Sequence, residues 1–64
     1  MEKPTTRDTL WTETFESTLT GGFYVEWNYR DASGELHAGV ARSKGEAGQQ
    51  AKAYGYDPLT SKVR

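Results

Sequence analysis

The chain has 64 residues, no cysteine, and eight lysine and arginine residues against nine aspartate and glutamate residues. This length leaves room for one domain with a small core, and the absence of cysteine excludes disulfides and thiolate metal sites. The nearly balanced charge argues against a strongly basic nucleic-acid-binding protein.

The two ends of the chain lack the pattern of a regular element. Residues 1–8 are polar and contain Pro4, which indicates a flexible arm, and residues 58–64 follow a helix stop and are expected to fray. We therefore expect a single small domain over residues 9–57. No apolar run approaches the roughly 18 residues of a membrane span, and the first residues lack the apolar stretch of a signal peptide. These features predict a cytoplasmic protein without membrane contact.

Residues 9–20, TLWTETFESTLT, fit two kinds of element. Trp11, Phe15 and Leu19 are four apart, as on one face of a helix, but five threonines in this segment favour a strand. We expect a strand and keep the helix as the alternative.

Two registers are open for that strand. A three-residue loop at 20–22 would pair Phe15 with Trp27 on the core face. A two-residue turn at 21–22 would put Trp11, Phe15 and Leu19 on the opposite face and expose an apolar patch beside Tyr24, and such patches are typical of interaction surfaces.

The segment FYVEWNYR, residues 23–30, alternates in polarity with the period of a half-buried strand. Leu36, Ala38 and Val40 alternate in the same way in the segment that follows. If DASG, residues 31–34, is a four-residue hairpin loop, Arg30 faces Glu35 and the register is set. It pairs Tyr29 with Leu36, Trp27 with Ala38 and Val25 with Val40 on one face, and Asn28 with His37 and Tyr24 with Ala41 on the other.

A helix is expected over about residues 44–54. Ser43 and Glu46 form a capping box, and Gly55 is placed to end the helix in the left-handed conformation. Ala47 and Ala51 give a narrow stripe that lets the helix lie close to an aromatic sheet face. Phe23, Val25, Trp27 and Tyr29 are expected to face that stripe. The predicted fold is therefore α+β, with a three-stranded antiparallel sheet packed against one C-terminal helix in the order β-β-β-α.

Catalysis is not expected, because His37 is the only histidine and so small a domain has no cleft to bring a nucleophile and a carboxylate to it. One histidine without cysteine also predicts no metal site, and no cofactor is expected. The predicted register places Gly39 opposite Glu26 on the sheet face away from the helix, as part of a flat strip. The candidate binding residues border this strip or lie near the helix start: Tyr24, Asn28, Arg30, His37, Arg42 and Lys44.

Part of the chain resembles a known family. Tyr29-Arg30-Asp31, then Ser33-Gly34, a strand, and Ser43-Lys44 with Glu46-Ala47 are similar to the N-terminal arm-type DNA-binding domains of phage and transposon tyrosine recombinases. Those domains have a strand reading like YRD, a turn DG, a short strand and a helix opening TKKEA. The resemblance covers roughly residues 23–55. It implies a three-stranded antiparallel sheet packed on one C-terminal helix, and a sheet face that enters the DNA major groove with these side chains on it: Tyr24, Asn28, Arg30 and His37.

A protein partner is nevertheless our first expectation. The chain has eight aromatic residues, nearly neutral charge, and Glu26 in the middle of the proposed reading face, and these features suit a protein interface better than a phosphate backbone. We expect a non-catalytic binding module, for example a phage or mobile-element accessory that occupies a host enzyme. DNA binding through the sheet face opposite the helix is the alternative. A homodimer formed through a strand edge or a patch around Leu19 is a third possibility.

Overall fold

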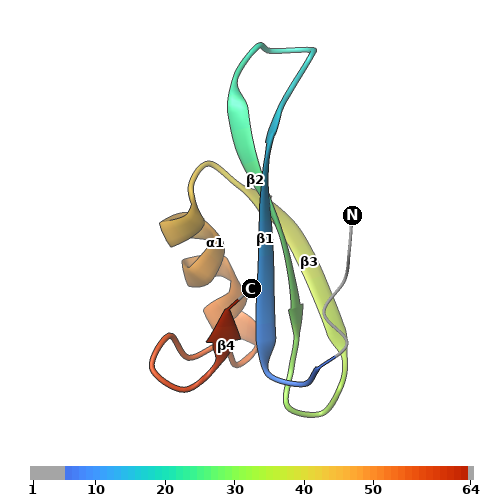
Figure 1. Cartoon of the computed structure of the whole chain (residues 1–64), viewed down its shortest axis with the longest axis vertical. Coiled ribbons are helices and arrows are strands. Elements are labelled where there is room, and N and C mark those ends of the chain that lie inside the picture. Colours follow the sequence, from blue (N-terminus) through green and yellow to red (C-terminus); the bar gives the residue numbers. More distant parts are fainter. Residues whose placement is uncertain (1–5, 64) are drawn as a thin grey trace.

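The structure is a computed structural model that describes residues 6–63, and it contains a four-stranded sheet with a helix on one face (Figure 1). The expected small α+β fold is confirmed, but the three-stranded antiparallel sheet is wrong. The strand order is β3-β2-β1-β4, and β4 runs parallel to β1. The elements are β1 (Thr9–Glu16), β2 (Phe23–Arg30), β3 (Leu36–Ala41), α1 (Lys44–Ala51), the 3-10 turn η1 (Lys52–Tyr54) and β4 (Lys62–Val63).

The fourth strand lies in the segment that was expected to fray. The carboxylate of Asp57 accepts a hydrogen bond from the Leu59 N–H at 2.9 Å, and the Asp57 N–H donates to Ser61 Oγ at 2.9 Å. This turn reverses the chain after the helix, so that the Lys62 N–H donates to the Asp8 carbonyl at 2.9 Å. The helix is therefore not the last element. Of the predicted flexible arm, residues 1–5 lie outside the described residues.

Residues 9–16 form a strand, so the helix alternative for this segment is wrong. Neither predicted register is correct, because the loop between β1 and β2 has six residues, 17–22. It is closed by Ser17, whose N–H donates to the Gly22 carbonyl at 2.8 Å, and Gly21 adopts a φ of 72°. Phe15 pairs with Tyr24, and Leu10 pairs with Tyr29. Leu10 rather than Phe15 therefore lies on the side of the sheet that the helix covers.

β3 pairs with β2 one residue away from the predicted register. Arg30 lies opposite Leu36 rather than Glu35, and Asn28 lies opposite Ala38 rather than His37. A shift of one residue turns every side chain of a strand to the other face of the sheet. His37, Gly39 and Ala41 therefore lie on the helix side, where Leu36, Ala38 and Val40 had been expected.

Hydrogen bonds that Asp31 makes within the β2–β3 loop cause this shift. Its carboxylate Oδ1 accepts hydrogen bonds from the N–H groups of Ser33 and Glu35, both at 2.9 Å. Its own N–H donates to the Glu35 carbonyl at 2.9 Å, so Asp31 and Glu35 still belong to the ladder. The loop is therefore the three residues 32–34, with Gly34 at a φ of 95°, instead of the four residues of DASG.

The helix begins where the sequence predicts, whereas the last three residues of the expected range form a 3-10 turn. Ser43 Oγ accepts from the Glu46 N–H at 3.1 Å, while the Glu46 carboxylate reaches back to the Arg42 N–H at 3.1 Å. The α-helical part ends at Ala51, η1 continues to Tyr54, and Gly55 has a φ of 107°. The predicted cap at each end is confirmed.

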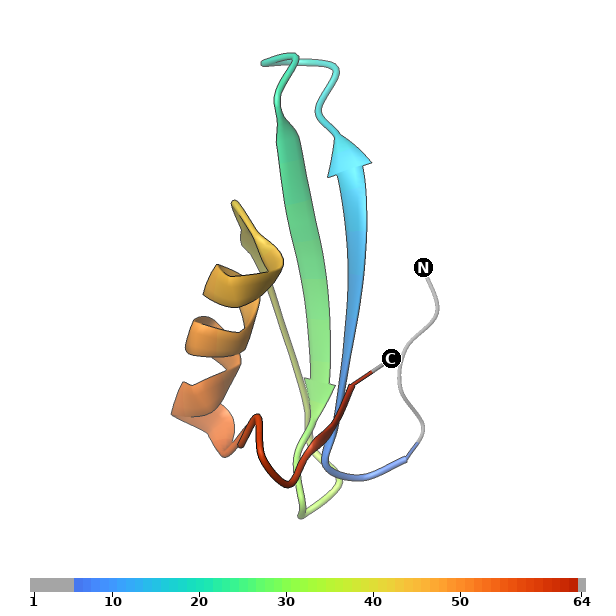
Figure 2. The same cartoon turned by 60° about the vertical axis from the view of Figure 1, so that its left-hand side comes forward.

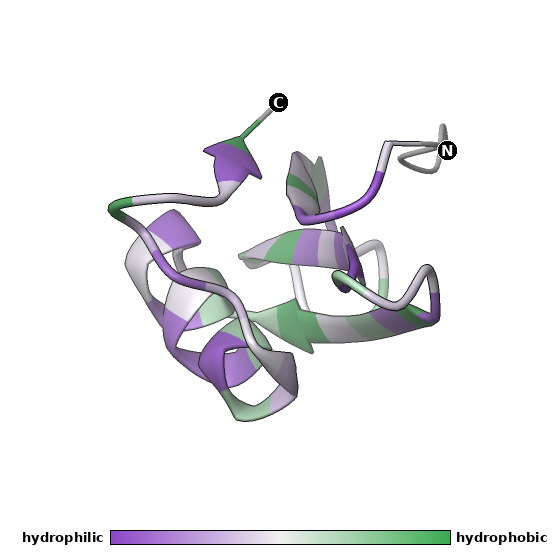
Figure 3. Cartoon of the chain, turned by 90° about the horizontal axis from the view of Figure 1, so that it is seen from below, coloured by the Kyte–Doolittle hydropathy of each residue, from purple (hydrophilic) through white to green (hydrophobic). Residues whose placement is uncertain are grey.

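The core lies between α1 and one face of the sheet, here called the helix face; the other is the open face. Seen along the strands, α1 lies on one side of the sheet only (Figure 3). Val25, Trp27 and Tyr29 face the helix as expected, whereas Phe23, on the same side of β2, is not covered by the helix and is 65% exposed. The buried hydrophobic residues are Leu10, Val25, Trp27, Tyr29, Ala41, Ala47 and Ala51.

Candidate functional site

The hairpin of β1 and β2 projects beyond the helix, and its end is covered by no other element in either view (Figures 1 and 2). We call residues 15–24 the hairpin tip. The long strands make the molecule elongated, with extents of 36 × 20 × 16 Å. α1 packs only on the half of the sheet away from the tip (Figure 1), so the side chains of the tip are not buried under the helix.

Large apolar side chains gather on this tip. Leu19 is 94% exposed, Phe23 is 65% exposed and Phe15 is 39% exposed. Phe15 lies on the open face and stacks on Tyr24, with the ring centroids 5.9 Å apart and the planes at 29°. Large exposed apolar groups that lie close together are typical of interaction surfaces, whereas single ones are ordinary.

Tyr24 is held in place from several sides. The Arg42 guanidinium carbon lies 4.9 Å from the centre of its ring, and its hydroxyl forms a hydrogen bond with Thr20 Oγ1 at 3.2 Å. Together with the Phe15 stack, these contacts fix the ring before any partner arrives. A fixed aromatic side chain loses little conformational entropy on binding, which favours its use in an interface.

Two carboxylates face each other below the aromatic pair. Glu13 of β1 lies directly opposite Glu26 of β2, on the open face. Like charges in this position weaken a hairpin by up to about 1 kcal/mol. Within residues 6–63, no lysine or arginine forms an ion pair with either glutamate.

The predicted residues Asn28 and Arg30 lie on the open face, but both serve the fold. Asn28 is only 2% exposed, between Trp11 of β1 and Ala38 of β3. Arg30 Nη1 donates to the Gly34 carbonyl at 2.6 Å and so supports the β2–β3 loop. The amide of Asn28 is too buried to reach a large ligand in this conformation.

His37 does not lie on the open face as predicted. It stacks on Tyr54, with the centroids 4.1 Å apart, and its Nε2 forms a hydrogen bond with Asp31 Oδ2 at 2.8 Å. Hydrogen bonds from the Ser33 hydroxyl and from His37 hold the pKa of the Asp31 carboxyl well below its usual range. Asp31 lies between the serine and the histidine, so His37 is not placed to activate the Ser33 hydroxyl as a nucleophile.

A second polar cluster joins the end of the chain to the start of β1. Tyr29 Oη donates to Asp8 Oδ1 at 2.7 Å, and Ser61 Oγ donates to the same oxygen. These two hydrogen bonds, that of Ser61 first, lower the pKa of the Asp8 carboxyl. Burial and the bond to Asp8 raise the pKa of Tyr29 to about 12. The cluster fixes β4 to the fold.

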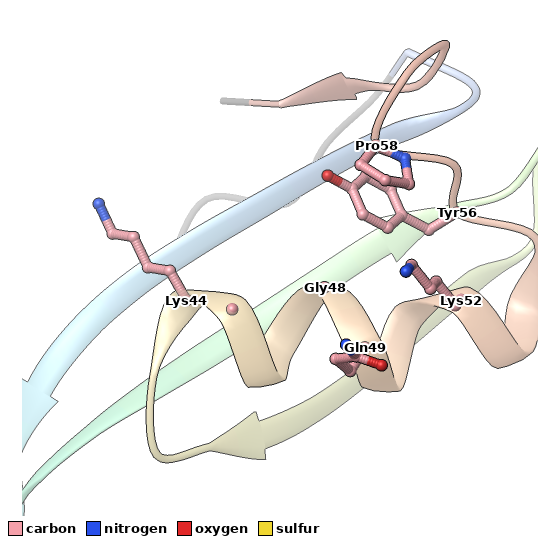
Figure 4. Close-up of a pocket in the computed structure, with 7 residues that line it drawn as sticks. Lys44, Gly48, Gln49, Lys52, Tyr56 and Pro58 are labelled. Atoms are coloured by element: carbon pink, nitrogen blue, oxygen red, sulfur yellow. The ribbon is translucent and has the colours of Figure 1, made fainter.

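Lys44 lies on a shallow pocket between α1 and the segment that follows it (Figure 4). Tyr56 and Pro58 form one side of the pocket, and its volume is about 190 Å³. This is smaller than the roughly 300–1,000 Å³ of ordinary small-molecule sites. Within residues 6–63, no three metal-ligating side chains gather into a site, and neither helical segment has the length and apolarity needed to cross a membrane.

No significant match to this chain was found among family models, curated proteins or solved structures.

The tip residues Phe15, Leu19 and Phe23 were not among the candidate binding residues, although one of the two registers considered exposes a patch near Tyr24. The missed signal is one of charge. Between Thr9 and Tyr29 the sequence contains three glutamates and no lysine, arginine or histidine. This single sign of charge, together with Phe15, Leu19 and Phe23, distinguishes the hairpin from the rest of the chain.

Proposed function

We propose that the chain is a non-catalytic binding module that engages another protein through the hairpin tip and the adjoining open face. The observation that supports this most directly is the exposure of large apolar side chains at a hairpin end that the helix does not cover. Phe15 stacks on Tyr24 on the open face, Leu19 lies in the loop, and Phe23 lies on the other side of β2. Aromatic residues are enriched in protein interfaces and in the residues that dominate binding energy.

The test uses two tip variants, Phe15→Ser and Phe23→Ser, with Leu59→Ser as the matched control. Leu59 is 91% exposed but lies in the turn after the helix. A partner captured from cells of the source is purified, and its dissociation constant is measured for each variant. We expect at least about tenfold weaker binding for each tip variant, and no change for Leu59→Ser. Equal binding by all four proteins would contradict the proposal.

DNA binding through the open face is the second candidate, because Tyr24, Asn28 and Arg30 share that face. The facing pair Glu13 and Glu26 in its middle would repel phosphates. A titration of a nonspecific duplex at low salt separates the two functions. We expect no binding, whereas affinity that falls steeply with added salt would favour DNA.

A further inference from the structure

The peptide groups of β1 alternate between the two sides of the strand, and a hydrogen bond at each end of the strand sets their direction. The Ser17 N–H bonds to Gly22 on the β2 side, and the Asp8 carbonyl bonds to Lys62 on the β4 side. Odd-numbered residues of β1 therefore turn their N–H and C=O groups toward β2. Even-numbered residues turn theirs toward the outer edge.

β4 covers only a small part of this outer edge. It pairs with Thr9 and Leu10, and above it β1 is the outermost strand (Figure 2). In the part of the chain that the structure describes, the outward N–H and C=O groups of Thr12, Thr14 and Glu16 meet no other strand. An unpaired edge of this length is a template for a further strand.

The side chains beside this edge select what can pair with it. On the open face β1 presents Trp11, Glu13 and Phe15 at alternate positions. The residues of an added strand that lie directly opposite them share their face. Apolar residues would suit Trp11 and Phe15, and a basic residue would suit Glu13, which already faces Glu26.

A second copy of this chain does not suit the edge. Two β1 edges paired antiparallel about Thr14 would set Glu13 of each copy diagonally next to Glu13 of the other, with Glu26 of each copy nearby. Cross-strand pairs of like charge are destabilising. The outer edge of β3 would not favour a basic partner strand, because Leu36–Ala41 carries no acidic residue.

We propose that the outer edge of β1 binds an extended segment of the protein partner with the pattern apolar, any, basic, any, apolar, the basic residue lying opposite Glu13. This inference rests on the proposed function, and it names the chemistry of the partner and the backbone groups that hold it. The segment pairs with Thr12, Thr14 and Glu16 through main-chain hydrogen bonds, while the tip aromatics contact the rest of the partner.

A synthetic peptide tests the edge directly. The probe is a nine-residue peptide whose centre reads valine, threonine, lysine, threonine, valine, and the control peptide has glutamate in place of lysine. We expect slower amide hydrogen exchange at Thr12, Thr14 and Glu16 in the presence of the probe, and about tenfold weaker binding of the control peptide. The difference should shrink as salt is added. Unchanged exchange up to about 1 mM probe, equal binding of the two peptides, or protection only along β3 would overturn the proposal.

Proline variants separate this inference from the proposed function. Thr14→Pro removes an outward N–H without taking a hydrogen bond from the β1–β2 ladder, and edge positions of this kind tolerate proline. The matched control is Ala38→Pro, which removes an outward N–H on the opposite edge, because the Asp31 to Glu35 bond sets odd-numbered residues of β3 toward β2. We expect Thr14→Pro to lose both peptide and partner and Ala38→Pro to keep them.

Binding through the tip and strand addition at the β1 edge predict different results for these variants. If Phe23→Ser loses the partner while Thr14→Pro binds it normally, the tip is the interface and strand addition is wrong. If neither substitution weakens binding, the proposed function fails as well. If sedimentation of the chain alone shows a dimer that protects Thr12 and Thr14, the edge belongs to a second copy and the proposal of a basic partner strand is overturned.

Discussion

Trp27 and Gly39 show how a single residue pair sets the packing of this small core. They lie opposite each other on the helix face, and the indole occupies the space above Gly39. The indole N–H also donates to Gln50 Oε1 at 2.7 Å, which ties the sheet to α1. The absence of a side chain at Gly39 is therefore what lets the largest buried ring lie close to the strand.

Gly39→Ala should destabilise the protein. An added Cβ would lie 2.7–2.8 Å from three atoms of the Trp27 ring, which is itself buried and held by Gln50. We expect the free energy of unfolding to fall by about 1–3 kcal/mol, the usual cost of overpacking.

Gly45→Ala is the matched control for this substitution. The nearest atom to an added Cβ there is Ser43 Oγ at 3.9 Å, and alanine favours the helix by up to about 1 kcal/mol. Urea denaturation measures both variants. A Gly39→Ala protein as stable as the wild type would show that Trp27 moves freely.

Tyr29 should make the protein sensitive to alkali. Its pKa is raised from 10.0 to about 12, first by burial and then by the bond to Asp8, so folding favours the protonated phenol. The stability it contributes is complete below pH 10 and is lost as the pH rises toward 12.

The Tyr29→Phe variant isolates this effect in unfolding measurements from pH 8 to 12. It should be less stable than the wild type near neutrality and should approach it at the alkaline end. Tyr54→Phe, which removes a hydroxyl from a ring that is 47% exposed, is the control for the loss of a tyrosine hydroxyl. A constant difference between wild type and Tyr29→Phe across this range would contradict the assignment.

The residue types of the β2–β3 turn were informative, but their detailed bonding was not visible in the sequence. Asp31, Ser33 and Gly34 correctly indicated a turn. What decides between a three-residue and a four-residue loop is the set of hydrogen bonds that the Asp31 carboxylate accepts from Ser33 and Glu35. Both loops are compatible with the same residues, so the register could not be chosen from composition.

At the scale of elements, local signals predicted β2, β3 and α1 well and the pairing of the strands poorly. The helix caps depend on neighbours in sequence, such as Ser43 and Glu46, and these were found. The strand pairing depends on which side chains meet across the sheet. Alternating polarity fits two registers that differ by one residue, and it placed β3 with its wrong face toward the helix.

β4 was missed for a related reason. Lys62–Val63 is too short to show any period, and it pairs only because the Asp57 turn and the Asp8 cluster bring it back to β1. The buried residues Ala47 and Ala51 were foreseen, and the exposed Phe23 was not, because the sequence does not show where the helix stops covering the strand.

Ser61→Ala should loosen β4 without unfolding the sheet. The Ser61 hydroxyl is the first cause of the lowered pKa of Asp8, and the Lys62 N–H donates to the Asp8 carbonyl. We expect faster amide exchange at Lys62 and titration of the Asp8 carboxyl at higher pH than in the wild type. NMR detects both changes. Thr60→Ala, at an exposed neighbouring site, should show neither, and an unaltered Lys62 exchange rate in Ser61→Ala would mean that the strand is held by other contacts.

At the scale of the whole molecule, the buried core and the exposed apolar side chains occupy different ends. The buried hydrophobic residues all lie under α1, whereas the tip carries Phe15, Leu19 and Phe23 in exposed positions. Charge divides in the same way. Three glutamates and no basic residue lie between Thr9 and Tyr29, so the eight basic residues all belong to the rest of the chain. Arg42 reaches this end through its contact with Tyr24, so a basic and apolar partner would meet mainly acidic and apolar side chains there, with one arginine beside them.

Removing the tip should therefore leave the fold intact. Replacement of residues 16–23 by Asn-Gly joins Phe15 to Tyr24, a pair whose peptide groups face each other across the ladder, and this dipeptide favours a two-residue hairpin turn. No buried residue is lost, and surface residues usually change stability by less than about 0.5 kcal/mol each. We expect a cooperative thermal transition within a few degrees of the wild type, together with loss of partner binding. A shortened chain that fails to fold would show that the six-residue loop and Phe23 are needed to form the β1–β2 register, and stability and recognition would then not be separable in this protein.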